Sequence, residues 1–223
     1  MKRFAAIVLV INALIAGRII AKPVNDTVAR NNNHDRLISD LRAATGNQVR
    51  VISKNRTGVI SMIGDDSRNG IAPNRLGSGT TIAERRGRGF LRQFGELLGV
   101  KDAEQDLKLE HSKRTNDGRD IVRFQQARHG IPVMGGEIIV QMNPSGRIIA
   151  CHAKVLPEQP VDNIPAITDE QAKTIALEAV AKRYKADLAE LTATPPELWI
   201  YDPSIWDSSV HSRQQLVWRM EIK

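Results

Sequence analysis

The segment RFQQARHGIPVMGGEIIV, which runs from Arg123 to Val140, decides the fold. Together with the two apolar residues before it, its first part forms the run from Ile121 to Gln126, which is expected to be a strand. His129 to Pro132 is expected to interrupt this strand, and a second strand is expected over Gly136–Met142. The segment therefore predicts two short strands of one antiparallel sheet, separated by a break.

The residues on either side of this segment predict a helix and further strands. Thr80 or Thr81 can cap a helix that Gly99 can stop, and its apolar residues recur at helical spacing: Phe90, Leu91, Phe94, Leu97 and Leu98. Glycines 87, 89 and 95 each weaken that helix by about 1 kcal/mol relative to alanine. Leu107 and Leu109 alternate with charged residues, and turn sequences at 116–118 and 143–146 separate the later strands. Residues 80–156 are thus expected to form one helix-on-sheet module.

A second module is expected over residues 167–223, after a proline-containing linker at 157–166. Thr168 and Gln171 stand three positions apart and predict a capping box. The helix that follows has one apolar stripe, formed by Ala172, Ile175, Ala176, Ala179, Val180 and Tyr184. Strands are expected at 198–201 and 215–220. The fold class is therefore α+β, with two helix-on-antiparallel-sheet modules behind a signal peptide.

Residues 22–79 predict a variable leader region with a possible short helix and a hairpin. Lys22 to about Asn33 lacks periodicity and is expected to be disordered, whereas Leu37, Ile38 and Leu41 predict one short amphipathic helix. Residues 49–52 and 59–63 predict a hairpin, with its turn at 54–58. Residues 65–79 are rich in glycine, asparagine, serine and aspartate and predict a loop.

Residues 1–21 predict a signal peptide. Lys2 and Arg3 precede a run from Phe4 to Gly17 that is apolar apart from Asn12. The run is shorter than the roughly 20 residues that a membrane-spanning helix needs, and it fits the apolar region of a secretory signal. Cleavage is expected between residues 16 and 21, with an uncleaved N-terminal anchor as the alternative. The protein is thus predicted to be secreted or periplasmic, with no stable membrane insertion after signal removal.

The composition bounds the kind of site that the chain can carry. The net charge is +7, and the densest basic cluster consists of Arg85, Arg86, Arg88 and Arg92. No aromatic platform of the kind that stacks nucleic-acid bases accompanies it, so we interpret the cluster as a solvated basic face and expect no nucleic-acid partner. Cys151 is the one cysteine, which excludes an internal disulfide.

The sequence contains no pattern typical of a catalytic or metal site. The five histidines are His34, His111, His129, His152 and His211; none precedes a glutamate, so H-E-x-x-H is absent, and no two lie four apart. G-x-S-x-G, P-loop and G-x-G-x-x-G patterns are also absent. Cys151 and His152 are adjacent on a predicted strand and should point to opposite faces. The Asp65-Asp66 pair is weak support for calcium. We expect no catalytic, cofactor-binding or metal-binding residues.

The opening segment nevertheless resembles the core of the fungalysin/thermolysin propeptide family, in which R-F-x-Q is followed by G-I/V-P-V and G-G-E before an apolar strand. The matching residues are Arg123, Phe124, Gln125, Gln126, Gly130, Ile131, Pro132, Val133, Gly135, Gly136 and Glu137. Met134 stands where the family often has an aromatic residue. Residues 167–223 resemble the companion PepSY domain, including its helix pattern and the Trp218-Arg219 strand, and a further strand is expected after them. The second module is therefore predicted to be incomplete at its C-terminus.

This resemblance implies a propeptide that assists the folding of a thermolysin-like zinc metalloendopeptidase and holds it inactive. The cognate catalytic domain would be the partner, and zinc and calcium would belong to that domain. The motif residues have scaffold roles, and Glu137 is expected to be structural or to contact the partner. Two alternatives stay open: a free-standing secreted protease inhibitor of the same fold, and a basic module that binds an anionic polymer.

Overall fold

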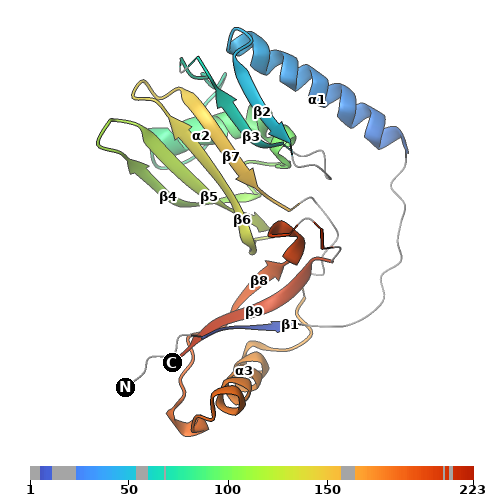
Figure 1. The fold of residues 1–223 in the computed structure, drawn as a ribbon, viewed down its shortest axis with the longest axis vertical. Coiled ribbons are helices and arrows are strands. Elements are labelled where there is room, and N and C mark those ends of the chain that lie inside the picture. Colours follow the sequence, from blue (N-terminus) through green and yellow to red (C-terminus); the bar gives the residue numbers. More distant parts are fainter. Residues whose placement is uncertain are drawn as a thin grey trace. The chain divides into compact units, whose positions relative to one another are not determined.

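The computed structural model describes residues 6–11, 24–53, 60–67, 69–156, 164–207, 209–210 and 213–223, and the fold is mixed α+β (Figure 1). The elements in chain order are β1 (Ala6–Ile11), α1 (Val24–Ala44), β2 (Val49–Ser53), β3 (Ile60–Asp65), α2 (Ile82–Phe94), the 3-10 helix η1 (Gly95–Leu98), β4 (Leu107–Arg114), β5 (Asp120–Arg128), β6 (Ile131–Met142), β7 (Ile148–Lys154), α3 (Asp169–Tyr184), η2 (Leu188–Glu190), β8 (Glu197–Tyr201), η3 (Pro203–Ile205) and β9 (Gln215–Ile222). Two compact units emerge. The central unit holds the described residues within 18–130 and 135–158, and the C-terminal unit holds the described residues within 1–17, 131–134 and 159–223.

The central unit is an antiparallel sheet covered by helix α2. Its strands follow the order β4-β5-β6-β7-β3-β2. Thr81 caps α2 by accepting a hydrogen bond from the backbone N–H of Glu84, and Gly99 ends η1 in the left-handed region at φ 80°. Three phenylalanines, Phe90, Phe94 and Phe124, are fully buried where the helix meets the sheet. A helix therefore lies on a sheet in this part of the chain, and the sheet also includes β2 and β3, which were expected outside the 80–156 module.

Two expectations about α1 and β6 were wrong. Residues 24–33, which lack apolar periodicity, form the first half of the 21-residue helix α1 and are not disordered. Leu37 and Leu41 of this helix are buried in the core, so tertiary packing anchors one end and the hydrogen-bonded backbone continues into the polar end. Strand β6 starts at Ile131 and not at Gly136, so Pro132 lies inside a strand near its beginning, a position that proline tolerates.

The hairpin expected before residue 65 is confirmed by the antiparallel pairing of β2 and β3. Its predicted turn at 54–58 lies outside the described residues, as do residues 157–163 of the predicted linker. The loop expected over residues 65–79 is largely irregular, although β3 extends to Asp65 and Ile71 forms an isolated antiparallel bridge with Ile148.

The C-terminal unit contains helix α3 and the strand order β1-β9-β8. The capping box at Thr168 and Gln171 is confirmed, and Lys185 ends the helix in the left-handed region at φ 52°. Residues 6–11 of the predicted signal peptide form β1, which pairs antiparallel with β9. Within the same unit, Val133 pairs in parallel with Ile200 of β8. No helix among the described residues is long and apolar enough to cross a membrane.

Candidate functional site

The motif segment forms the hairpin of β5 and β6. Its turn consists of His129 and Gly130, whose φ angles are 48° and 82°. Positive φ at both central residues is the geometry of a type I′ turn, which matches the right-handed twist of the flanking strands. A break over the four residues His129 to Pro132 was expected here, but a two-residue turn suffices because a glycine occupies its second position.

Gly135 is a second position where the backbone requires glycine. It lies inside β6 at φ 74°, a conformation that L-residues with a Cβ rarely adopt. The residues on either side of it belong to different compact units, because 131–134 are grouped with the C-terminal unit and 135–158 with the central unit. The backbone freedom expected from the glycine pair is therefore used where β6 passes from one unit to the other.

The inner face of the hairpin packs against α2. Phe124 is fully buried, and the guanidinium carbon of Arg88 lies 5.1 Å from the centre of its ring. A methyl group added to Gly87 of α2 would lie 3.3 Å from the same ring, so the helix approaches the sheet closely at this point. Val122, Ile138, Val140 and Met142 complete the inner face and are buried as well. Phe124 and its neighbours thus carry the packing of the motif.

The outer face of the hairpin carries polar pairs that are partly open to solvent. Arg123 lies 3.3 Å from a carboxylate oxygen of Glu137 and 3.9 Å from one of Glu110, and these three side chains are between 35% and 48% exposed. The side-chain amide of Gln125 donates to the carbonyl of Gly136 at 2.6 Å. Four motif residues therefore meet on one face, and Arg123 and Glu137 present charge to solvent beside each other.

Gln126 forms a buried clamp between β5 and the residues that follow β7. Its Nε2 donates to the carbonyl of Leu156 at 3.0 Å, and its Oε1 accepts from the backbone N–H of Leu156 at 2.9 Å. Arg128 donates to the same carbonyl at 2.7 Å. A buried primary amide is costly unless it is satisfied, and here both its ends are used. The motif's second glutamine is therefore structural, and its partner lies too far along the chain for a sequence pattern to reveal.

The basic cluster of α2 does not form a solvated face as a whole, which corrects the sequence interpretation. Arg88 is only 6% exposed and pairs with Glu84 at 3.0 Å, one helical turn earlier. It also donates to the carbonyls of Ala103 and Leu107. Arg92 is half exposed and pairs with Glu104 at 2.6 Å. The i, i+4 spacing of Glu84 and Arg88 was the available signal for this pair.

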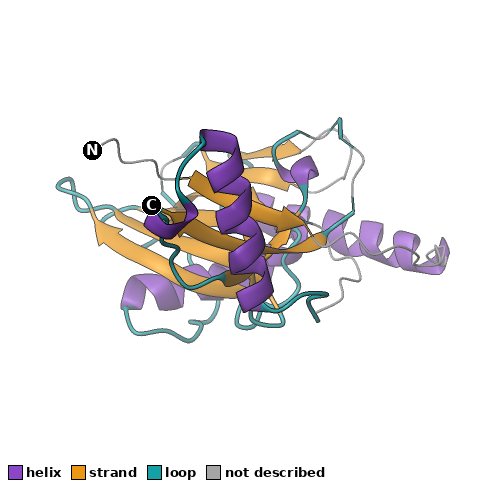
Figure 2. Ribbon diagram, turned by 90° about the horizontal axis from the view of Figure 1, so that it is seen from below, coloured by secondary structure: helices purple, strands orange, loops and turns teal. Residues whose placement is uncertain are grey.

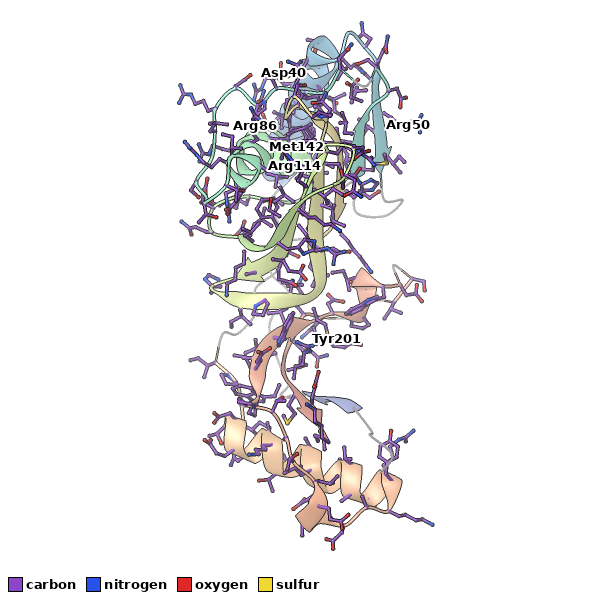
Figure 3. The ribbon with its side chains drawn as sticks, turned by 90° about the vertical axis from the view of Figure 1, so that its left-hand side faces the viewer. Asp40, Arg50, Arg86, Arg114, Met142 and Tyr201 are labelled. Atoms are coloured by element: carbon purple, nitrogen blue, oxygen red, sulfur yellow. The ribbon has the colours of Figure 1, made fainter. Side chains whose placement is uncertain are left out.

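Two carboxylates near this helix titrate below their ordinary range. A hydrogen bond from Arg114 lowers the pKa of Asp120, and the charge of Arg86 acts in the same direction; Figure 3 labels both arginines. Burial alone would raise the pKa of Glu104, but hydrogen bonds from Ser78 and Arg92 and the charge of Arg88 lower it. Both carboxylates are therefore ionised partners of arginines at neutral pH and are unsuited to act as acids.

The other residues considered for catalysis or metal binding, the Cys151–His152 pair and the Asp65–Asp66 pair, lie in surroundings typical of structural residues. Burial raises the pKa of the Cys151 thiol, and the adjacent His152 is exposed, so the two residues face opposite sides of β7 as expected. Asp65 accepts hydrogen bonds from the backbone N–H groups of Ser67 and Gly70, and Asp66 pairs with Arg50 at 3.0 Å. Among the described residues, no group of three or more histidine, cysteine, aspartate and glutamate side chains could hold a metal ion.

Comparison with known proteins gives a match that coincides with this hairpin. No curated protein matches the chain. The Bacillus megaterium YpeB C-terminal domain is a similar solved structure, with 18% sequence identity, a TM-score of 0.38, and coverage of 76% of this chain and 79% of that one. The segment from residue 105 to residue 155, which holds β4 to β7, matches the family model of the Fungalysin/Thermolysin Propeptide Motif.

Proposed function

We propose that the chain is the propeptide of a secreted thermolysin-like zinc metalloendopeptidase, acting as an intramolecular chaperone and inhibitor of the cognate catalytic domain. The observation that carries the proposal is the family match over residues 105–155, which covers the sheet strands β4 to β7 and contains the whole motif hairpin. The roles of the motif side chains agree with it. Phe124 packs in the core against α2, and Gln126 binds the backbone of Leu156. Arg123 and Glu137 present charged groups to solvent, as expected for a scaffold that binds a partner.

Two parts of the proposal concern the ends of the described chain. Residues 1–21 serve as the export signal, with cleavage between residues 16 and 21. Residues 167–223 act as a second module of the PepSY type, in which a capped helix lies on antiparallel strands. Zinc and calcium belong to the catalytic domain, and this chain contributes no ligand to them.

Tethering explains how such a propeptide works with a modest interface. A domain joined to its target by a short linker experiences an effective concentration in the millimolar range. Added as a separate molecule, the chain loses this advantage and should inhibit only at about tens of micromolar, the range of a weak transient complex. The net charge of +7 would steer the chain toward an acidic protease surface, and added salt would reduce that steering.

The test mixes the purified chain with the mature cognate protease and follows peptide hydrolysis against chain concentration. A parallel arm refolds denatured protease with and without the chain. We expect slower hydrolysis and a higher yield of refolded protease. No change in either arm at tens of micromolar, about where a weak complex should saturate, would contradict the proposal.

A matched variant tests whether the outer face of the motif hairpin contacts the protease. Exchanging the two charges, in the double variant Arg123→Glu with Glu137→Arg, preserves an ion pair within the chain but reverses the charge at each position. Because exposed pairs contribute at most about 1 kcal/mol, the stability of the chain should barely change. Weaker inhibition by this variant would place the Arg123–Glu137 pair in the interface, and unchanged inhibition would leave the pair with a structural role alone.

A further inference from the structure

Strand β9 has a different neighbour along each of its two edges. On one side lie β8 and residues 192–194. Lys223 exchanges hydrogen bonds with Thr192, with both N···O distances 2.9 Å, and the carbonyl of Glu221 accepts from the N–H of Thr194 at 2.9 Å. On the other side lies β1, which comes from the predicted signal peptide. Export as proposed above would remove β1, and among the residues that the structure describes no other strand pairs with this second edge.

The hydrogen-bonding groups of that second edge can be assigned. Along an antiparallel strand, successive residues direct their N–H and C=O groups to alternate sides. The backbone groups of Glu221 and Lys223 form hydrogen bonds with residues 192–194. The N–H and C=O groups of Met220 and Ile222 therefore point to the other side, toward β1. The register agrees, because Ala6 lies opposite Ile222 and Val8 lies opposite Met220. The edge thus offers a ladder of donors and acceptors at every second residue.

Helix α3 supplies an apolar surface above this edge. It contacts both β9 and β1, and it lies across the strands of its unit in Figure 2. Its buried residues Ala172, Ala176 and Val180 form one cluster with Met220 and Ile222 of β9. Ile175 of the same helix is still 46% exposed. A strand seated beside β9 therefore has the aliphatic surface of α3 over one of its faces.

We propose that the open edge of β9, together with α3, is an acceptor site for an extended, uncharged apolar segment of a folding client polypeptide, which replaces β1. The sequence that occupies the site in this chain, AIVLVI, has that chemistry. This inference rests on the proposed function, in which the client is the protease chain during folding. Strand addition of this kind obtains affinity from main-chain hydrogen bonds and specificity from alternate side chains.

A second copy of β9 fits the same edge less well. Paired antiparallel, it would bring a second α3 to the same face, over the space where the first α3 already contacts β1. Its sequence also carries Arg219 and Glu221, whereas β1 has no charged residue. The apolar segment is therefore the occupant that the structure favours.

The first test uses the full chain and unseats β1 by proline substitution. Val8→Pro combined with Val10→Pro removes two N–H groups that face β9, and the matched control, Ile7→Pro with Leu9→Pro, removes two that face away. We expect amide exchange at Met220 and Ile222 to accelerate by roughly tenfold or more in the first variant and by less in the control. Equal acceleration in both variants would overturn the hydrogen-bond assignment.

The second test adds a synthetic peptide with the sequence of residues 5–12, AAIVLVIN, to the variant with the open edge. The peptide should bind saturably and restore the protection of Met220, and it should bind the unmodified chain far more weakly. Methylation of the backbone nitrogen at the position of Val8 should weaken binding roughly fivefold relative to methylation at the position of Leu9.

Three outcomes would overturn the proposal: no saturable binding, equal effects of the two methylations, or a chain dimer that the peptide does not dissociate. The result is separable from that of the protease assay. A chain that captures the peptide but leaves the protease unaffected has the acceptor site without the proposed function, and a chain with the reverse behaviour has the function without this site.

Discussion

Removal of the Arg88 guanidinium should be among the most destabilising single changes in the central unit. In Arg88→Met, the carboxylate of Glu84 stays buried with its side chain 5% exposed and loses its cationic partner. The N–H of Thr80, at 2.9 Å, remains as a donor to that carboxylate, whereas the carbonyls of Ala103 and Leu107 lose the donor that Arg88 provided. Breaking a buried pair from one side costs about 3–5 kcal/mol, and we expect a loss in that range.

Two companion variants test whether the loss of stability in Arg88→Met comes from the burial of the ion pair. Arg92→Met removes the other arginine that pairs with Glu104, but the Arg92 side chain is 49% exposed, so it should cost at most about 1 kcal/mol. The double variant Glu84→Leu with Arg88→Met removes both buried charges together. It should be more stable than Arg88→Met alone, because no uncompensated charge remains.

The assay is urea unfolding followed by far-UV circular dichroism at pH 7. Since two compact units need not unfold in one step, amide exchange at Phe124 and Val140 should report the central unit separately. If Arg88→Met costs no more than Arg92→Met in both measurements, the reasoning about burial of this ion pair fails.

Three further outcomes follow from the packing and the electrostatics. Gly89→Ala should lower the thermal midpoint more than Gly87→Ala, because its added methyl would lie 2.0 Å from the carbonyl oxygen of Arg75, against 3.3 Å from a ring carbon for Gly87→Ala. Because the pKa of Asp120 is lowered in the folded chain, the unfolded chain binds more protons at this residue. The Arg114–Asp120 pair therefore stabilises the fold above a pH of about 4, and this contribution is lost as the pH falls through the folded pKa. Arg114→Met should flatten the corresponding part of the plot of urea midpoint against pH between pH 7 and pH 3. Dialysed chain should contain far less than one zinc per molecule and should not hydrolyse casein; stoichiometric zinc in elemental analysis would contradict this.

The elements that could be predicted from the sequence are those whose signals are local. The capping box at Thr168 and Gln171 placed the start of α3 within one residue, and the runs of strand-forming residues bounded by turns placed β5 and β9 closely. Residues 24–33 were misread because a polar helix has no apolar period, and its stability comes from Leu37 and Leu41, which pack into the core. The apolar run near the N-terminus has no periodicity that separates a strand from an export signal.

The site was predictable as a family pattern but not as a set of contacts. The motif residues were found in the sequence, yet the partner of Gln126 lies 30 residues away at Leu156, beyond any local rule. The glycines of α2 were interpreted as weak points of a helix. The structure assigns two of them a packing role, since Gly87 lies against Phe124 and Gly89 lies under the carbonyl of Arg75. Only the three-dimensional arrangement distinguishes a glycine that weakens a helix from one that lets the helix backbone approach its neighbour closely.

The pairing of β3 with β7 has a consequence for the time at which the central unit can form. Arg147 donates to the carbonyl of Asn69, 78 residues earlier, at the same end of the sheet where Ile71 and Ile148 pair. At about 5–20 residues per second, a ribosome needs roughly 4–16 s to make the later partner after the earlier one. During that interval the hairpin β2–β3 lacks its neighbouring strand, and isolated hairpins are marginally stable at best. We therefore expect this region of the nascent chain to stay unfolded until β7 has been synthesised.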